Sequence, residues 1–357
     1  MLQTEHPVLR KFYYPVIPMS ELKDGPKPIT MFGQPLVVWL DEAGKPAAAV
    51  DRCCHRSAKL SKGTIRNGSV VCPYHGWAFN GEGKCTYFPQ SKLENPPKVY
   101  KIKAYRCEER YGYVWVALEE PLTGIPEFKR FGEPGFRQIH EFYHVVNCSG
   151  LRMMENSFDN AHIAFVHHNT FGDNNDPIPA EINLVQNEWG FEMFSEINVT
   201  NKLNKEVKAI NVESDETVRT THSRWFMPFI RQTDITYPTG LVNSIVTCVT
   251  PIEEGSCMLT QFVFRNDTEE QVPAEKVIAF DRAVVAEDLE VLESTEPNVA
   301  LDVTQRLETH MYSDKPGIVM REMLLKLLES HGERETLPQL NPPQLYKMEI
   351  LDPVKEQ

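Results

Sequence analysis

The chain has 357 residues, of which 41% are hydrophobic, and this is enough to bury the cores of two domains. Its formal net charge of −13 argues against a nucleic-acid ligand, because phosphate binding depends on accumulated Lys and Arg side chains. It has no apolar run near the roughly 18 residues that a membrane helix needs. His6 and Pro7 stand where a signal peptide would need an apolar core, so we expect a cytoplasmic protein.

Residues 1–125 predict a small all-β domain. Segments rich in β-branched and aromatic side chains, at 35–40, 69–74 and 111–118, alternate with turns marked by Gly, Pro and Asn. The Pro-containing stretch Glu119–Phe128 indicates a boundary, so we divide the chain into domains 1–125 and 126–357.

Positive charge is concentrated in the first domain. From Arg52 to Arg110, twelve Lys or Arg residues stand against four acidic residues, which gives this stretch +8 and leaves −21 for the remainder. A basic module of this kind favours an acidic partner. The alternative is a solvated run of charges without a binding role.

The second domain is predicted to mix helices with a sheet. Residues 151–168 have helical periodicity, and residues 184 to about 264 alternate like strands. Residues 269–294 and 315–330 each predict a further helix. The predicted fold class is therefore α+β.

Four metal-ligand residues lie close together in the first domain, in the pattern C-x-H-x16-C-x2-H: Cys53, His55, Cys72 and His75. On an extended segment, residues two apart point the same way, so Cys53 and His55 can face one centre while Cys54 points elsewhere. The second pair lies on the loop "CPYHG", where the proline and glycine let the backbone turn.

Two Cys and two His are compatible with tetrahedral zinc or with a [2Fe-2S] cluster held by two thiolates and two imidazoles. Each half of the motif offers one Cys and one His, which suits a cluster whose two irons need different ligands. The spacing resembles the Rieske motif. The other five cysteines have no comparable partners and are expected to be small buried hydrophobic residues: Cys85, Cys107, Cys148, Cys248 and Cys257.

A second group of metal-ligand residues follows in the second domain, where Asp159, His162 and His167 form the pattern D-x2-H-x4-H after Asn156. A separation of five residues rotates a regular helix by about 140°, which would leave the two histidines on different faces. The pattern therefore predicts a π-type widening or a break in the helix. His168 is expected to point away from the site and to be exposed.

Two histidines need a carboxylate to complete the facial triad of non-haem Fe(II), which leaves coordination positions open for O2. The late helix offers five candidates: Asp281, Glu287, Asp288, Glu290 and Glu293. Asp288 is the first choice because it shares the apolar stripe of Val284 and Val291 and so faces inward. Glu287 is the second choice, and Glu290 and Glu293 are typical of a solvated helix face.

The two groups in this order resemble the Rieske non-haem iron oxygenases, specifically their terminal oxygenase α chains, over nearly the whole chain. "HRSAKLSKGT", "CEERYG" and "AEDLEVLES" are most similar to methylxanthine N-demethylases, vanillate and dicamba O-demethylases and saxitoxin-pathway hydroxylases. The resemblance implies a Rieske domain followed by a helix-grip-like antiparallel sheet. It further implies a head-to-tail homotrimer in which each cluster feeds the iron of the next chain.

The resemblance also assigns roles to individual residues. The cluster would be bound by Cys53, His55, Cys72 and His75, and the mononuclear Fe(II) by His162, His167 and Asp288. Asp159 would not be a ligand but would connect the iron site to a Rieske histidine of a neighbouring subunit. Asn156 would support the iron site from behind its ligands.

Electrons must come from another protein, because the chain has neither G-x-G-x-x-G nor the cysteine spacing of a plant-type ferredoxin. We expect a separate NAD(P)H reductase, with or without a ferredoxin. Two alternatives to an oxygenase are an electron-transfer Rieske protein with a non-catalytic second domain and a zinc-stabilised binding module.

The expected reaction is reductive O2 activation followed by C–H hydroxylation, or by oxidative N- or O-demethylation, of a small organic substrate. Pocket walls are expected from the region of Phe165, Phe171, Trp225 and Phe226 and from the sheet strands. Residues 167–177 are expected to form a lid over the entrance.

Overall fold

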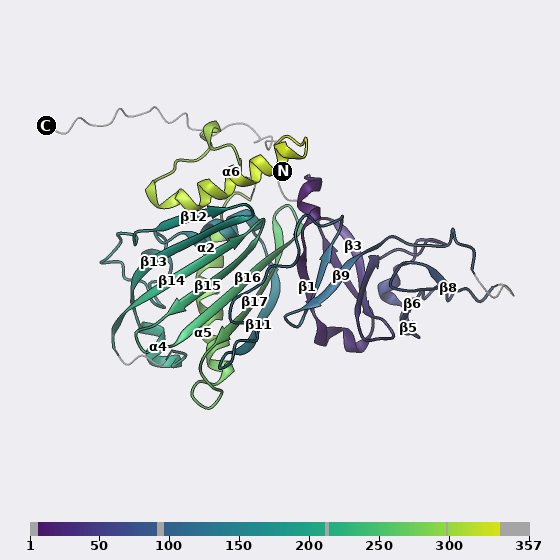
Figure 1. Ribbon diagram of the computed structural model, residues 1–357, viewed down its shortest axis with the longest axis horizontal. Coiled ribbons are helices and arrows are strands. Elements are labelled where there is room, and N and C mark those ends of the chain that lie inside the picture. Colours follow the sequence, from purple (N-terminus) through teal and green to yellow (C-terminus); the bar gives the residue numbers. More distant parts are fainter. Residues whose placement is uncertain (1–5, 91–95, 211–213, 298, 336–357) are drawn as a thin grey trace.

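The computed structural model describes residues 6–90, 96–210, 214–297 and 299–335. Its named strands form three antiparallel sheets of six, four and seven strands. Figure 1 shows the two smaller sheets in the N-terminal half, and the large sheet with the long helices in the C-terminal half. The predicted α+β class is confirmed.

The N-terminal half is built from short strands. The six-stranded sheet has the order β1-β10-β9-β4-β3-β2 and consists of β1 (Tyr14–Pro18), β2 (Lys27–Met31), β3 (Gln34–Leu40), β4 (Pro46–Val50), β9 (Ala104–Arg110) and β10 (Tyr113–Ala117). The four-stranded sheet consists of β5 (Thr64–Arg66), β6 (Ser69–Val71), β7 (Ala78–Phe79) and β8 (Cys85–Tyr87). Short 3-10 turns lie at Pro7–Lys11, Met19–Asp24 and Leu60–Lys62.

The β-rich segments of the sequence correspond to three of these strands. Segments 35–40 and 111–118 contain most of β3 and all of β10. Segment 69–74 forms a strand only in its first half, because the chain turns from Cys72 onward. Residues 91–95, which belong to the basic stretch, lie outside the described residues.

The seven-stranded sheet has the order β11-β17-β16-β15-β14-β13-β12. Its strands are β11 (Arg137–Val146), β12 (Asn183–Asn187), β13 (Gly190–Thr200), β14 (Glu216–Phe226), β15 (Ile230–Thr236), β16 (Val242–Glu253) and β17 (Ser256–Arg265). The alternation from residue 184 onward is thus confirmed as a sheet, with the short helix α4 (Lys202–Val207) inserted. Strand β11 lay outside the predicted sheet, yet it pairs with β17 at one edge.

The remaining helices are α2 (Gly150–Phe158), α3 (Ile163–Val166), α5 (Ala274–Leu292) and α6 (Lys315–Ser330), with 3-10 turns at Val303–Gln305 and Tyr312–Asp314. The long predicted helix starts only at Ala274, because Pro273 has an extended backbone and takes the N-cap position. Helix α6 has the predicted bounds and packs on α2. Within the described residues, no helix is long and apolar enough to cross a membrane.

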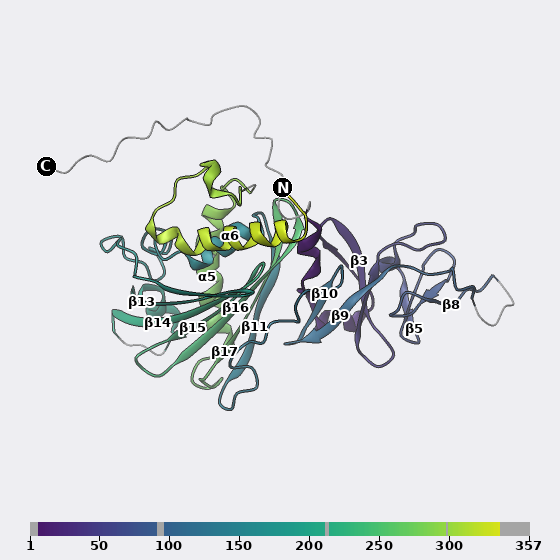
Figure 2. The same ribbon diagram turned by 45° about the horizontal axis from the view of Figure 1, so that its top comes forward.

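The two halves are joined by backbone contacts and a shared core. Phe32 and Gly33 donate backbone hydrogen bonds to the carbonyls of Pro251 (2.9 Å) and Ile252 (2.7 Å) at the end of β16. One hydrophobic cluster includes Tyr14 of β1 and Leu259 of β17. In Figures 1 and 2 the four-stranded sheet lies at the end of the N-terminal half that points away from the large sheet.

Candidate metal centres and cavity

The first candidate metal centre is formed by two short loops, residues 53–57 between β4 and β5 and residues 72–76 between β6 and β7. In the first, the backbone N–H of Ser57 donates to the carbonyl of Cys53 at 3.0 Å. In the second, the N–H of Gly76 donates to the carbonyl of Cys72 at 3.0 Å. Gly76 has a φ of 74°, a left-handed conformation that glycine adopts without strain. Each loop therefore turns back on its own cysteine.

Cysteines and histidines of these loops differ in exposure. Cys53 and Cys72 are each 2% exposed, whereas His55 is exposed and His75 half-buried. The two imidazole rings lie 4.5 Å apart between centroids. The arrangement places two thiols inside and two imidazoles at the surface, a donor set of the kind that would hold a cluster whose two irons take different ligands. Cys54 is exposed, as predicted for a residue that is not a ligand.

The chemistry of the buried thiols fits a bound metal group. Burial raises the pKa of Cys53 to about 12, and the neighbouring Cys72 adds to the rise. A thiolate at neutral pH therefore needs a cation beside it, which a metal supplies. The motif residues present fit a [2Fe-2S] group by donor type, burial and spacing.

Two further residues, Trp77 and Gln90, support this site, and Gln90 was not singled out in the sequence. The ring of Trp77 stacks on His55 with centroids 4.7 Å apart and an interplanar angle of 5°. Nε1 of Trp77 donates to Gln90 at 3.0 Å, and Nε2 of Gln90 donates to the carbonyl of His75 at 2.8 Å. The tryptophan follows directly after the "CPYHG" loop, and this proximity was the available signal.

The second candidate centre lies where the helix is interrupted. Helix α2 ends at Phe158, Asp159 has an extended backbone, and α3 comprises a single turn between His162 and His167. His162 takes the N-cap position of α3 and His167 the C-cap position. The predicted break is confirmed and lies before His162. The two histidines then flank a single helical turn, and His167 departs from helical geometry with a ψ of 27°.

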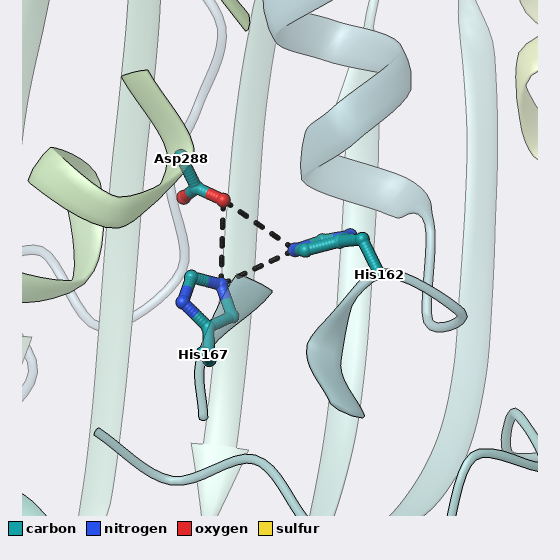
Figure 3. A group of neighbouring side chains, drawn as sticks. All are labelled: His162, His167 and Asp288. Carbon is teal, nitrogen blue, oxygen red and sulfur yellow. Dashed lines mark hydrogen bonds and ion pairs between the residues drawn. The ribbon is translucent and has the colours of Figure 1, made fainter. Parts of the chain in front are cut away.

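Figure 3 shows the imidazoles of His162 and His167 and the carboxylate of Asp288 pointing at one another. The two Nε2 atoms lie 3.2 Å apart. Oδ1 of Asp288 lies 3.5 Å from Nε2 of His162 and 3.3 Å from Nε2 of His167. All three donor atoms lie within 4.8 Å of one another, and the buried Oδ1 of Asp288 has no hydrogen-bond partner among the described residues. Two neutral imidazoles and a carboxylate fit a facial Fe(II) site.

Charge also favours this grouping. Burial alone would raise the pKa of Asp288, but the nearby imidazoles of His167 and His162 and a hydrogen bond from Asn156 hold it below its usual value. Burial lowers the pKa of His167, yet Asp288 and Glu287 more than compensate and the net shift is upward. The structure thus brings together the predicted residues His162, His167, Asp288 and Asn156.

Glu287 lies beside the group but not in it. Its Oε2 is 3.0 Å from Nδ1 of His167, and the hydroxyl of Thr170 donates to the same oxygen at 2.7 Å. The carboxylate therefore fixes the orientation of the imidazole from behind. Thr170 was not anticipated from the sequence.

The other carboxylates of α5 lie elsewhere. Asp281 is buried beside Glu141 of β11, Glu290 is exposed, and Glu293 accepts the backbone N–H of Asn147 at 2.9 Å. His168 is exposed, as predicted, with Nδ1 2.9 Å from the carbonyl of Phe165.

Asp159 sits at the edge of this group of three side chains. Its Oδ2 lies 3.4 Å from Nδ1 of His162, on the side of the ring away from His167 and Asp288, and its Oδ1 accepts the N–H of Ala161 at 2.7 Å. Burial would raise the pKa of Asp159, but the hydrogen bond and charge of His162 and the two backbone N–H groups hold it below its usual value. Its side chain remains 29% exposed, so a second protein can reach it.

A cavity between the helices and the large sheet opens onto these three side chains. Its wall includes His162, His167 and Asp288 together with sheet residues of β13–β17. Phe171 lines it as predicted, but the other three expected wall residues do not. Trp225 is packed in the core against Phe191, Phe226 contacts Phe128, and Phe165 is 59% exposed.

These three wall predictions were wrong for local reasons. Phe226 lies on the face of β14 opposite to the lining residues Thr221 and Ser223, whereas Trp225 shares their face but lies further along the strand, in the core. Residues 173, 176 and 177 line a second hollow that shares Asn160 and Ile163 with the main cavity. The lid stays a prediction. The other five cysteines are buried or half-buried, which confirms the prediction for them.

Comparisons with known proteins match both halves of the chain. Residues 12–104 match the Rieske [2Fe-2S] domain, and residues 146–330 match the vanillate O-demethylase oxygenase C-terminal domain. Methylxanthine N1-demethylase NdmA of Pseudomonas putida is 27% identical over 100% of this chain and 97% of its own length. Methylxanthine N3-demethylase NdmB of the same species is 29% identical over 88% of each.

Solved structures give the same picture. The structure of Pseudomonas putida NdmA with caffeine has a TM-score of 0.79 at 27% identity and covers 91% of this chain and 93% of that chain. Dicamba monooxygenase bound to dicamba, at 23% identity, shares the fold with a TM-score of 0.77 over 91% of this chain and 98% of that chain.

Proposed function

This chain belongs to the Rieske oxygenases that carry the vanillate O-demethylase oxygenase C-terminal domain, and on that premise we propose that it monooxygenates a small organic substrate with electrons received through its cluster. It is a terminal oxygenase, and its cofactors are a Rieske [2Fe-2S] cluster and a mononuclear iron, with O2 as co-substrate. The zinc-module and pure electron-transfer alternatives are thereby rejected.

We assign the cofactors to particular residues. Cys53, His55, Cys72 and His75 would hold the cluster, and His162, His167 and Asp288 the iron. The convergence of these last three side chains on the wall of a cavity is the observation that carries the proposal.

The protein's own residues prepare this site for chemistry. The iron, when bound, supplies the reductive activation of O2. Glu287 holds the imidazole of His167 in one orientation, and Asn156 hydrogen-bonds Asp288. Apolar wall residues such as Phe171, Ile245 and Val284 exclude water from the space beside the ligands.

Electrons would pass between chains of a head-to-tail homotrimer. Within one chain, the cluster loops lie in the part of the N-terminal half that points away from the large sheet (Figure 2). Asp159 lines a surface hollow together with Asn156 and His162, so a Rieske histidine of a neighbouring chain can dock there. We infer that Asp159 accepts a hydrogen bond from that histidine and connects it to His162.

A separate NAD(P)H reductase, with or without a ferredoxin, would deliver the electrons. Arg52, Arg56, Lys59 and Lys62 are exposed around the cluster loops, and the exposed His55 is the natural point of entry. A cationic rim of this kind attracts an acidic redox protein.

The division near residue 125 and a cytoplasmic location also remain our predictions.

Two outcomes remain for the reaction, hydroxylation of a C–H bond and hydroxylation of an N- or O-methyl group with loss of formaldehyde. The test is turnover of purified enzyme with NADH and a generic reductase against methylated heterocycles, methoxyarenes and alicyclic compounds. Formaldehyde and hydroxylated product are both measured, and His162→Ala is the inactive control. No product from any class would contradict the proposal.

Transfer between chains has its own test. Cys72→Ala should lack the cluster and His162→Ala the mononuclear iron, so each should be inactive alone. Co-expressed and purified as mixed trimers, they should regain a fraction of wild-type turnover, because some intact clusters then adjoin intact iron sites of another chain. Mixed trimers without activity would contradict the route.

A further inference from the structure

The cavity beside the three iron ligands also contains a buried cation. Arg219 projects from β14 into its wall and is only 7% exposed. Its guanidinium lies 4.3 Å from the ring centre of Phe171, and Phe171 in turn stacks on His167 with centroids 4.6 Å apart. A single aromatic ring therefore separates Arg219 from an iron ligand.

Arg219 makes no ion pair with a carboxylate of the described residues, and its buried Nε has no hydrogen-bond partner among them. Its polar neighbour is the hydroxyl of Tyr237. Two other buried arginines of this sheet pair with carboxylates, Arg265 with Asp267 and Arg224 with Asp234. A buried guanidinium without a counter-charge is costly unless something else supplies one.

The carboxyl group nearest to Arg219 in the cavity wall, that of Asp281, does not serve as a dedicated counter-charge for it. Asp281 of α5 also lines the cavity, but it lies against Glu141 of β11. Burial and the charge of Asp281 raise the pKa of Glu141 well above its usual value, and burial also raises the pKa of Asp281. The charges of three arginines act on Asp281, those of Arg265, Arg219 and Arg231, so this carboxyl group is not reserved for Arg219. Arg231 lines the same cavity and donates to the carbonyl of Ser157 at 2.8 Å.

We propose that Arg219 binds an anionic group of the substrate, a carboxylate in the first instance, and so selects organic acids for oxidation. The inference rests on the proposed oxygenase function and names its substrate class. The planar fork of a guanidinium matches a carboxylate with two parallel hydrogen bonds. Because Phe171 fixes the guanidinium one ring away from His167, an acid held there presents its far end to the iron ligands.

The test compares acids with their neutral counterparts. Benzoate, 4-methoxybenzoate, nicotinate and indole-3-carboxylate are titrated into anaerobic holoenzyme by calorimetry, each beside its primary amide of nearly the same shape. Wild type should bind at least one acid about tenfold or more tightly than the amide, as a charge-assisted bidentate contact in a buried site predicts.

Variants identify the residue responsible. Arg219→Gln should reduce the acid-to-amide preference by about tenfold or abolish it, while affinity for the amide changes little. Arg219→Lys keeps the charge but not the fork and should retain part of the preference. Lys276→Gln removes one exposed positive charge from α5 and should leave the preference unchanged.

Cluster absorbance and iron content of each variant establish that it is folded and loaded. Equal affinity for acids and amides, absence of binding by every acid, or an undiminished preference in Arg219→Gln would overturn the inference. None of these results bears on turnover: an enzyme that oxidises neutral compounds and shows no acid preference keeps its oxygenase function and loses only the proposed substrate class.

Discussion

Nδ1 of His167 donates its hydrogen to Oε2 of Glu287 across 3.0 Å, which leaves Nε2 of the same ring facing His162 and Asp288. The hydroxyl of Thr170 donates to the same Glu287 oxygen and so holds the carboxylate in place. Two adjacent acidic residues of α5 therefore take different positions. Asp288 is one of the three converging side chains, and Glu287 lies behind the imidazole of His167.

Glu287→Gln should weaken retention of the mononuclear iron by about 10- to 100-fold, because the orienting carboxylate loses its charge. The measurement is the rate at which a chelator removes iron from the reduced holoenzyme, with cluster absorbance followed in parallel. Glu290→Gln, on the exposed face of the same helix, serves as the matched control and should behave as wild type. Equal rates for all three proteins would show that Glu287 does not position the ligand.

Asp159→Asn should separate the connecting role from a ligand role, because Asn keeps the shape but loses the charge and most of the acceptor strength. We expect an intact cluster, most of the mononuclear iron retained and turnover nearly abolished. In single-turnover experiments, O2 with substrate present should oxidise the reduced cluster more slowly than in wild type.

Two results would speak against this role of Asp159. Substantial steady-state activity in Asp159→Asn would exclude it as the electron bridge. Selective loss of mononuclear iron would make it a ligand and leave Asp288 without its proposed task.

The local parts of this site could be predicted from the sequence. The Cys53–His55 and Cys72–His75 pairs each lie within one loop, so spacing alone indicates that they face a common centre. The five-residue separation of His162 and His167 conflicts with a regular helix, and that conflict predicted the break now seen after Phe158. Asp288 followed from its place in an apolar stripe.

Other parts depend on contacts between distant segments, which a single sequence does not reveal. Glu287 was predicted only as a second choice of ligand. Its contact with His167 joins two segments that lie 120 residues apart, so the sequence did not reveal that it supports the histidine from behind. Strand β11 was missed because it alternates less regularly, with a bulge between His140 and Phe142. Arg219 lies on an alternating strand, but which inward-facing positions line a cavity depends on the helices that pack over the sheet.

The proposed docking of a reductase depends on charge. Lys59→Glu and Lys62→Glu should each lower reductase-driven turnover several-fold at low salt, and raising ionic strength should slow the wild type, since screening shortens to about 8 Å near physiological salt. Both side chains are exposed, so folding should be unaffected. Lys276→Glu reverses one exposed charge on α5 and is the control. Unchanged rates in both lysine variants and at high salt would leave the basic stretch without a docking role.

The buried pair of Glu141 and Asp281 predicts a dependence of stability on pH. Burial, followed by the charge of Asp281, raises the pKa of Glu141 in the folded protein, while the unfolded chain titrates near ~4.3. Above that value the unfolded chain has released a proton that the folded protein keeps, so rising pH favours unfolding until the folded-state pKa is passed.

Glu141→Gln removes this proton and keeps an oxygen that accepts from Nε2 of Gln261, a contact of 2.8 Å in the wild type. The variant should therefore gain in free energy of unfolding relative to wild type between pH 6 and pH 8, by up to about 1.4 kcal/mol per pH unit. Urea denaturation of holoenzyme at pH 6, 7 and 8 measures the difference. A constant or shrinking difference would indicate that Glu141 is ionised in the folded protein.

The central claim is that one chain holds a Rieske cluster and a separate mononuclear iron. The most direct test is to count the irons in anaerobically reconstituted protein. Wild type should contain three irons per chain, whereas His162→Ala should contain two, with an unchanged Rieske spectrum and no product formed with any reductase. Two irons in both proteins, or three in both with equal turnover, would contradict the assignment of His162, His167 and Asp288 as the site of oxygen chemistry.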